Sequence, residues 1–518
     1  MSDEATMKTV DTVIDDIGFG WFQVAVLILC GFVQASDMLE IQYVSLVSQR
    51  LQCVWWISDY WKSFITSATF IGLFVGAYLW GPMGDKHCRR SVTAVCMGFI
   101  AVYGFLTALA PNVIWVVILR FLVGTGIGGV QPLTSAMFSE FMTSDTRGMT
   151  WFVFQGLWCL GGLVEIGFAW LLLDLQHGWR YLAVVTALPM LFLSLPWLLW
   201  LPVSPRQSLL QGRLAETRQA LNKMADMNSQ PRYLGDFTVT DLLQGKQKNG
   251  RISELIRPDT YLRLSLQLAF ISFVGGFNYY GMILLNVQVP LLLHERCVLT
   301  DSATNVTRAS PWQPGLDRSC HSCSPFNYIE MLIPTMADLV TALVNAFIIE
   351  RFLGRRLIMA IAFCLASILI PLLSCCMDSS ARIVLFFVIR FFIASGYDVV
   401  WLYVLEAYPT SLRSTAVGFH SSFSRIASIL VPYVAQIFIT RVSLLGGLLI
   451  FSGLLALATL NAALLPIETK AMPLAQTRSP QQIAADSSNE KQMMMAKSDE
   501  AVPGHQGYGS VNTPTKMD

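Results

Sequence analysis

Charged residues are scarce in this chain of 518 residues: Asp, Glu, Lys and Arg make up 13% of it, about half of their share in soluble domains. Histidine is also scarce, with six residues scattered along the chain. No GxxxxGK[ST], HExxH or GxSxG motif occurs. We therefore expect no enzyme activity, no ATP-driven pumping, no cofactor and no metal site. The net charge of +1 offers no basic surface for a nucleic acid.

Apolar residues, in contrast, are abundant and make up 54% of the chain. A helix needs about 20 apolar residues to cross the core of a lipid bilayer. The sequence contains twelve runs of this kind, at 20–48, 64–84, 91–110, 113–138, 150–173, 179–200, 262–293, 326–349, 357–377, 381–405, 414–440 and 442–465. This pattern predicts an all-α membrane protein with twelve transmembrane helices.

The distribution of positive charge predicts the orientation. Loops after even-numbered spans carry more than twice as many Lys and Arg residues as loops on the other face, so the positive-inside rule places both termini in the cytoplasm. We expect five segments: a cytoplasmic N-terminal segment (1–19), a six-helix bundle (20–200), a cytoplasmic middle loop (201–261), a second six-helix bundle (262–465) with a lumenal or extracellular loop (294–325), and a disordered cytoplasmic tail (466–518).

Charged motifs recur at a nearly constant separation along the chain. GPMGDKHCRR at 81–90 is echoed by IERFLGRR at 349–356, RFLVG at 120–124 by RFFIA at 390–394, and SEFMTSDTR at 139–147 by LEAYPTSLR at 405–413. Duplication of a six-helix unit explains this repeat. Two such halves with a cleft between them form a transporter architecture.

These motifs resemble those of the major facilitator superfamily. The loop after the second span is similar to the family's G-x-x-x-D-R/K-x-G-R-R pattern, with Cys88 replacing a glycine. EAYPTSLR and LPIETK resemble the organic-ion and sugar transporter branch, while TVDTVIDDIGFGWFQ, SDMLE, RFLVGTGIGGVQP and GFNYYG resemble the synaptic vesicle two-related branch. The resemblance covers about residues 9–470 and implies the major facilitator fold of two pseudo-symmetric six-helix bundles.

The resemblance also implies a role for charges at the cytoplasmic ends of the helices. In the family, such charges latch the two halves in the outward-facing state, and the latch must break during alternating access. The corresponding residues are Asp85, Arg89, Arg90, Glu140 and Arg147 in the first half, and Glu350, Arg356, Glu406 and Arg413 in the second.

Ionisable residues at bilayer depth are candidates for the functional site, because they are costly unless they face a cavity or a partner. Asp37 and Glu40 lie three residues apart, on one face of the first helix. Arg120 and Glu165 have a similar depth in the outer half of the first bundle. Because two carboxylates on one face repel, the site favours a proton or a cationic substrate. A purely structural role, in which the acids bond to neighbouring helices, is the alternative.

The second half has a comparable set of residues. Asp338, Arg390, Asp398 and Arg425 lie on predicted helices, and Asp398 with Arg425 could instead form a structural ion pair. Phe277, Asn278, Tyr279 and Tyr280 are suited to line an organic-ligand pocket, although a core role is the alternative. The glycines of GTGIGG at 124–129 indicate close helix packing.

Four cysteines fall in loops on the non-cytoplasmic face: Cys53, Cys297, Cys320 and Cys323. We expect disulfides there, with metal binding by the CxxC as the alternative. The same face holds the chain's N-glycosylation sequon at Asn305.

We therefore expect a monomeric secondary transporter of a small organic ion, cationic or zwitterionic because membrane acids outnumber membrane bases, with protons as the coupling ion. It would lie in an intracellular vesicle membrane or the plasma membrane. One alternative is a transporter-like vesicle protein that acts as a receptor or trafficking partner. A passive sugar facilitator is a further alternative, although the membrane charges argue against it.

Overall fold

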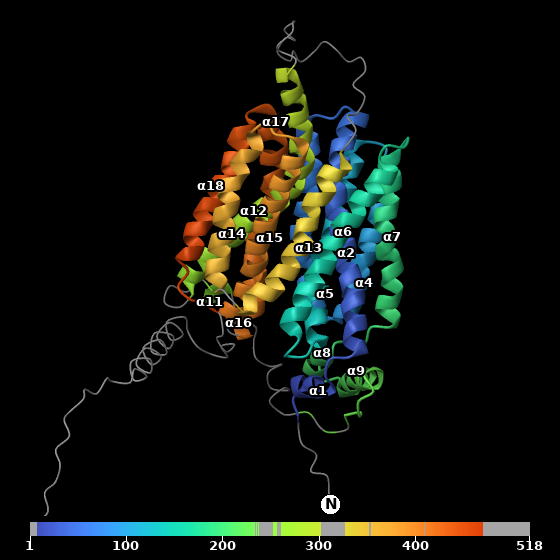
Figure 1. The fold of residues 1–518 in the computed structure, drawn as a ribbon. Helices are drawn as coiled ribbons and strands as arrows, with labels where there is room; N and C mark the ends of the chain where they lie inside the picture. The colour runs from blue at the N-terminus through green and yellow to red at the C-terminus, as the bar shows by residue number, and fades with distance from the viewer. Residues whose placement is uncertain are drawn as a thin grey trace, which may run out of the picture.

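The computed structural model describes residues 8–233, 235, 237, 252–255, 261–301, 327–351, 354–408 and 410–469. In this part of the chain, twelve helices are long and apolar enough to cross a membrane (Figure 1). The first six are α2 (Trp21–Val54), α3 (Asp59–Lys86), α4 (Arg89–Ala108), α5 (Val113–Phe141), α6 (Arg147–Leu172) and α7 (Gly178–Leu199). The other six are α12 (Leu262–Asp301), α13 (Tyr328–Arg351), α14 (Arg355–Leu369) with η2 (Ile370–Ser374), α15 (Ser379–Ala407), α16 (Thr410–Pro432) with η3 (Tyr433–Phe438) and α17 (Ile439–Arg441), and α18 (Leu444–Ala463). The predicted all-α fold with twelve spans is confirmed.

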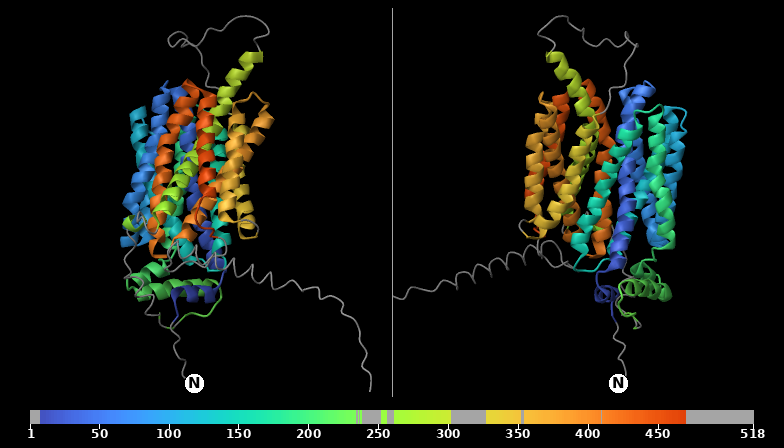
Figure 2. Two further views of the ribbon diagram at one scale, coloured as in Figure 1. Left: turned by 90° about the vertical axis from the view of Figure 1, so that its left-hand side faces the viewer. Right: turned by 45° about the vertical axis from the view of Figure 1, so that its right-hand side comes forward.

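The helices form two bundles that lie side by side (Figures 1 and 2). In the first bundle α3 and α4 pack on α5, α2 packs on α6, and α4 packs on α7. In the second, α12 packs on α16, α13 and α14 pack on α15, and α14 packs on α18. The bundles meet where α6 packs on α13 and α3 packs on α16. Any site between the two halves is therefore bounded by these helices together with α2 and α12.

Glycines allow α3 and α5 to approach each other closely. A Cβ atom added at Gly124 would lie 2.1 Å from the backbone oxygen of Thr69, and one added at Gly128 would lie 2.2 Å from that of Leu73. A side chain of any size would push the helices apart. The interpretation of the GTGIGG segment as a packing motif is confirmed.

Three short helices cover one end of the first bundle, which we call the inner end; the opposite end is the outer end. They are α1 (Val10–Ile17), α8 (Pro205–Leu210) and α9 (Leu214–Met227) (Figure 1). Asn228 joins them to the start of α2: its Oδ1 accepts a hydrogen bond from the Phe22 N–H at 3.0 Å, and its Nδ2 donates to the Gly18 carbonyl at 3.1 Å. A fourth short helix, α11 (Ile252–Leu255), precedes α12.

Two helices of the first bundle begin or end beyond their predicted apolar runs. Helix α2 continues past 48 to Val54, and α3 begins at Asp59 rather than at 64. At about 1.5 Å per residue, a helix of the length of α2 exceeds a bilayer core of about 30 Å, so its last turns can carry polar groups such as Gln49 and Gln52.

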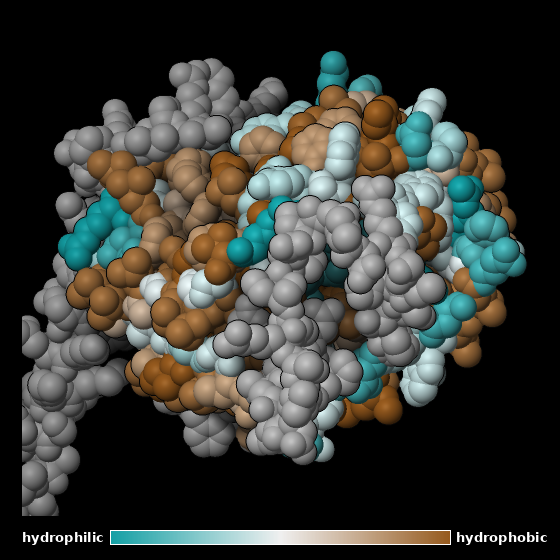
Figure 3. All heavy atoms as spheres, turned by 90° about the horizontal axis from the view of Figure 1, so that it is seen from above, coloured by the Kyte–Doolittle hydropathy of each residue, from teal (hydrophilic) through white to brown (hydrophobic). Residues whose placement is uncertain are grey.

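The first residues of the predicted tail also pack on the second bundle. The Ile467 carbonyl accepts a hydrogen bond from the Tyr403 hydroxyl at 2.6 Å, and Glu468 accepts one from the Arg355 backbone N–H at 2.7 Å. Residues 470–518 lie outside the described part of the chain. Hydrophobic side chains lie around much of the edge of the molecule when it is seen from the outer end (Figure 3), as surfaces that face lipid require.

Candidate functional site

Asp37 lies on α2 at the interface between the two bundles. Its side chain is fully buried, and neither carboxylate oxygen has a hydrogen-bond partner. Trp158 on α6 and Arg425 on α16 are within electrostatic range of this carboxylate. The indole Nε1 of Trp158 is close to it without a hydrogen bond of normal geometry, and no salt bridge joins Asp37 to Arg425 within the described residues. The carboxylate is therefore available to a ligand or a proton.

Glu40, one turn further along α2, is paired within the first bundle. Its Oε2 accepts a hydrogen bond from Nη1 of Arg120 at 2.7 Å, and both side chains are 1% exposed. Arg120 also donates to Oγ1 of Thr107 at 2.8 Å, and its guanidinium lies over the ring of Tyr43, 4.7 Å from the centroid. Of the two carboxylates on this face of α2, the structure pairs Glu40 with an arginine and leaves Asp37 without a salt bridge.

Glu165 on α6 is the second carboxylate near this pair. It is fully buried, and both of its oxygens lie 3.1 Å from Oγ1 of Thr186 on α7. The hydroxyl of Thr186 also lies 2.7 Å from the Leu182 carbonyl, and a hydroxyl has one proton to donate. If that proton goes to Leu182, Glu165 must carry a proton of its own to bond with Thr186. Glu40 and Arg120 are the charged groups that interact with Glu165.

A similar arginine–acid pair occupies the second bundle. Arg390 on α15 donates two hydrogen bonds to Asp338 on α13, from Nε at 2.9 Å and from Nη2 at 2.7 Å. It also donates to Oγ1 of Thr335 at 3.2 Å, and Asp338 accepts a further bond from the Tyr279 hydroxyl at 3.0 Å. Both charged side chains are 2% exposed. In each bundle, therefore, one buried arginine pairs with one carboxylate, which balances its charge, and donates a further hydrogen bond to one threonine hydroxyl.

Asp398 and Arg425 do not form the ion pair that the sequence left open. Arg425 donates from Nε to Oγ of Ser421 at 3.1 Å and from Nη1 to the Leu73 carbonyl of α3 at 2.6 Å. Asp398 instead faces Asp338 and Asn345. It lines a small cavity between the bundles together with Gln155, Trp158, Cys159, Tyr279 and Asp338.

The four residues predicted on the seventh span divide between the interface and the core. Tyr279 stacks on Trp158 of the other bundle, with ring centroids 5.9 Å apart, and Tyr280 meets Phe70 of α3 edge to face at 5.1 Å. Phe277 packs on Phe451 of α18 inside the second bundle, as in the core role that was the alternative. Asn278 is fully buried and donates a hydrogen bond to the backbone of its own helix.

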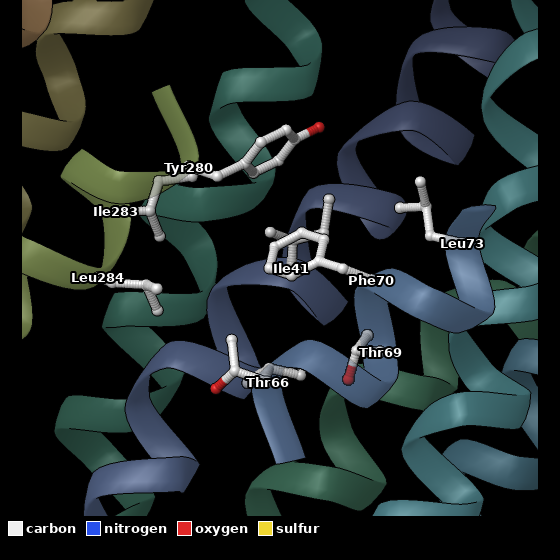
Figure 4. A pocket seen from close by; sticks show the side chains of 9 residues that line it. Ile41, Thr66, Thr69, Phe70, Leu73, Tyr280, Ile283 and Leu284 are labelled. Carbon is white, nitrogen blue, oxygen red and sulfur yellow. The ribbon is translucent and has the colours of Figure 1, made fainter. Parts of the chain in front are cut away.

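A second small cavity lies next to Tyr280, between α2, α3 and α12. Ile41, Phe70 and Leu73 from the first bundle face Ile283 and Leu284 from the second (Figure 4). Thr66 and Thr69 also line it. Its walls are therefore mostly apolar, and its occupant would be small.

Charges predicted to latch the halves pair within their own bundles. In the first bundle Arg89 bonds to Glu140 and to Asp85, the latter at 2.9 Å, and Arg90 donates to the Leu201 carbonyl at 2.9 Å. In the second, Arg355 pairs with Glu406 at 3.2 Å, and Arg356 donates to the Ala463 carbonyl. The side chains of Arg147, Glu350 and Arg413 lie outside the described part of the structure.

Polar contacts between the bundles lie instead along α3 and at the outer end, where no sequence motif predicts them. Arg441 donates to Asp59 at 2.7 Å. Lys62, only 1% exposed, donates to Oε1 of Gln288 on α12 at 3.3 Å. Lys62 lies outside the predicted second span, which begins at 64. The structure buries it in the first turn of α3.

Six cysteines are free thiols within the described residues, and Cys53 is not one of them. The side chain of Cys297 and residues Cys320, Cys323 and Asn305 lie outside the described part of the structure. No group of three or more His, Cys, Asp or Glu side chains that could hold a metal ion occurs among the residues searched.

Comparison with known proteins places this geometry in a family. A family model described as "Sugar (and other) transporter" matches residues 23–286 and 327–479. The synaptic vesicle 2-related protein of Xenopus laevis is 30% identical over 461 residues, which are 89% of this chain and 81% of that protein. The organic cation/carnitine transporter 7 of Arabidopsis thaliana is 32% identical over 511 residues, 92% of this chain and 97% of that protein.

Solved structures have the same fold. The partially occluded inward-open form of the xylose transporter XylE from E. coli matches with a TM-score of 0.65 and 16% identity, over 88% of this chain and 100% of that chain. A XylE structure described as a major facilitator superfamily proton:xylose symporter, with bound 6-bromo-6-deoxy-D-glucose, matches with a TM-score of 0.61 and 15% identity, over 88% of this chain and 98% of that chain. The fold and the relatives are those of transporters rather than enzymes. The chain belongs to the sugar (and other) transporter family, and it has the fold of the major facilitator superfamily structure of XylE.

Proposed function

We propose that this protein is a secondary active transporter that moves a small cationic or zwitterionic organic molecule across a membrane, with protons as the coupling ion. The observation that carries the proposal is Asp37. It is a fully buried carboxylate without a hydrogen-bond partner, at the interface between the two bundles.

An unpaired charge in this position is costly, because it has lost its water and gained nothing in return. A bound cation or proton offsets that cost. Trp158 and Tyr280 are neighbours of this carboxylate, and aromatic rings attract organic cations through cation–π contact. The site therefore suits an organic cationic group better than a sugar.

The acids of the first bundle suit proton coupling. Glu40 and Glu165 are both buried beside Arg120, which is bonded to Glu40 and not to Glu165. Two carboxylates and one guanidinium leave one negative charge in a dry site unless a proton neutralises it. In this proposal Asp37 and Glu40 bind the substrate's cationic group or the proton, Glu165 holds a second proton, and Arg120 couples protonation to the change in conformation.

Alternating access requires contacts that break at each end of the molecule in turn. The outer end holds the inter-bundle pairs Asp59–Arg441 and Lys62–Gln288. At the inner end, the latch charges Arg89 and Glu140 bond to each other within the first bundle. We infer that this conformation is closed at the outer end and that the latch charges exchange partners when the outer end opens.

The relatives favour transport but differ in what their names imply. One is named as an organic cation and carnitine transporter, and XylE is a proton:xylose symporter. Others are named only as synaptic vesicle 2-related proteins, which favours a vesicle membrane and keeps a receptor or trafficking role as the second candidate. The positive charge around the inner end supports cytoplasmic termini, and we propose a monomer.

We further propose disulfides at the outer end. Cys53, which follows the predicted first span, and Cys376, which follows η2, support this because neither is among the free thiols of the described residues. With six other cysteines free, the candidates for their partners are Cys297, Cys320 and Cys323. Glycosylation of Asn305 in the same segment is an accompanying proposal. Mass spectrometry of peptides from the unreduced protein, with and without glycosidase, tests both.

Ligand-dependent thermal stabilisation tests the transport proposal. The purified protein is heated with a panel of organic cations, organic anions, zwitterions, sugars and nucleotides at two pH values, beside Asp37→Asn. The proposal expects a cation or zwitterion to raise the melting temperature of the wild type in a pH-dependent way and to have no effect on Asp37→Asn. If no ligand of the panel raises the melting temperature of the folded protein, the receptor role is favoured.

A further inference from the structure

Among the described residues, three arginines are buried within membrane helices, and they differ in their partners. Arg120 and Arg390 each bond to a carboxylate. Arg425 is 7% exposed, yet no salt bridge of the described residues includes it. Its two hydrogen bonds go to a serine hydroxyl and a backbone carbonyl, both neutral. A guanidinium has five N–H donors, so Arg425 keeps both its full charge and unused donors.

A carboxyl group without a salt bridge lies near Arg425 on the other bundle. Asp37 on α2 has no hydrogen-bond partner of normal geometry. Ile41, one turn further along α2, lines the same cavity as Tyr280 and as Leu73, whose carbonyl holds Arg425. Two opposite charges therefore lie near each other across the bundle interface without closing into a salt bridge.

This arrangement is selective for the charges that a ligand carries. A ligand with one cationic group would satisfy Asp37 and leave Arg425 without a counter-ion. An organic anion would do the reverse. Only a ligand with both charges offsets the desolvation of both protein groups. The membrane helices contain five acids and three bases, and this excess of acids alone would favour a cation. Two of these acids, however, are paired with Arg120 and Arg390 in the structure. The excess therefore does not describe the charges that a ligand would meet.

The adjacent cavity limits the rest of the ligand. Ile41, Phe70, Leu73, Ile283 and Leu284 provide apolar walls in front of Tyr280 (Figure 4). Leu73 also supplies the carbonyl that holds Arg425. The ligand body that fits beside these charges is short and apolar.

We propose that the central site binds a small zwitterion, with its ammonium group on Asp37 and its carboxylate on Arg425. This inference rests on the proposed transport function and specifies its substrate class. Because Asp37 lies in the first bundle and Arg425 in the second, the bound zwitterion connects the two halves. Arg425 is thus a specificity-determining residue, since it distinguishes a zwitterion from a simple amine.

A series of ligands with and without each charge tests the proposal. The zwitterions are β-alanine, γ-aminobutyrate, 5-aminovalerate and glycine betaine, and the matched probes are γ-aminobutyrate methyl ester, butylamine and butyrate. Binding is measured by thermal stabilisation of the full chain in detergent, for the wild type, Arg425→Gln, Asp37→Asn and the control Arg232→Gln, whose exposed arginine lies at the inner end. Arg425→Lys, which keeps the charge, is used if Arg425→Gln does not fold.

At least one zwitterion is expected to bind about 10 to 100 times more tightly than its ester, amine and acid counterparts, as the loss of one charge-assisted hydrogen-bond pair implies. Arg425→Gln should remove the preference over the amine, Arg425→Lys should reduce it, and Arg232→Gln should leave it unchanged. If an amine binds as tightly as the zwitterions, and Arg425→Gln changes the binding of neither, the inference is overturned while the transport proposal stands. If no charged ligand stabilises the folded wild type, both are overturned.

Discussion

The Glu40–Arg120 pair gives the sharpest stability prediction. Both side chains are 1% exposed, the Nη1–Oε2 distance is 2.7 Å, and Arg120 has a further bond to Thr107 and a ring contact with Tyr43. Removing one member of a buried pair leaves an uncompensated charge and costs about 3–5 kcal/mol, whereas replacing both members with apolar side chains is often close to neutral.

We therefore expect Glu40→Leu and Arg120→Met to be strongly destabilising and the double variant to recover most of the loss. For a cooperative unit of about 150–250 residues, the size of one bundle, 1 kcal/mol moves the melting temperature by about 2–4 °C, so each single change should lower it by roughly 6–20 °C. A carboxyl can accept a proton, whereas a guanidinium does not release one in proteins. The loss caused by Arg120→Met should therefore be smaller at pH 5 than at pH 8, and that caused by Glu40→Leu should not.

Thermal unfolding of the detergent-purified protein, followed by tryptophan fluorescence, measures these effects. Arg232→Met is the matched control, because Arg232 pairs with Asp226 while 63% exposed and should leave the melting temperature unchanged. Single variants that melt within about 2 °C of the wild type, or a double variant that shows the sum of the two losses, would refute the reasoning.

Three further predictions concern packing and surface contacts. Gly124→Ala should lower the melting temperature because the added Cβ would lie 2.1 Å from a backbone oxygen of α3, whereas Gly98→Ala, with open space around its added Cβ, should not; equal effects would contradict the close approach of α3 and α5. Asn228→Ala should speed hydrogen exchange of backbone amides at the start of α2, where its side chain accepts the Phe22 N–H; unchanged exchange there would show that this cap is not needed. Arg382, whose side chain is 12% exposed, pairs with Glu330, whereas Arg441, which is 43% exposed, pairs with Asp59. Because an exposed pair contributes only about 0–1 kcal/mol, Arg382→Gln should lower the melting temperature more than Arg441→Gln. The reverse order would show that burial does not determine the strength of these pairs.

The fold was predictable because membrane helices are encoded as long apolar runs. The twelve predicted spans match the twelve long helices of the described residues within a few residues at most ends. What the apolar runs could not show is the short helix α1 at the inner end. Helix α1 has buried residues at 10, 13, 14 and 17, the spacing of an amphipathic helix. That spacing is the signal for this helix in the sequence, whereas the apolar runs predict only a cytoplasmic segment at 1–19.

The candidate site was predictable in its residue types and not in its pairing. Asp37, Glu40 and Arg120 could be selected because charges in apolar runs are exceptional. Which acid meets Arg120 depends on how α2 crosses α5, and Glu40 lies 80 residues away from it in sequence. The same limit applies to Arg425, whose lack of a carboxylate partner follows only from helix packing.

The central claim, proton-coupled transport of a small cation or zwitterion through a site at Asp37, is tested most directly by uptake into proteoliposomes. Radiolabelled ligand from the stabilisation panel is added to vesicles with and without an imposed pH gradient, for the wild type, Asp37→Asn and Arg232→Gln. We predict uptake above the equilibrium level that requires the gradient, is lost in Asp37→Asn and is retained in Arg232→Gln. Normal gradient-driven uptake by a folded Asp37→Asn, or no uptake by the wild type of a ligand that it binds, would contradict the account.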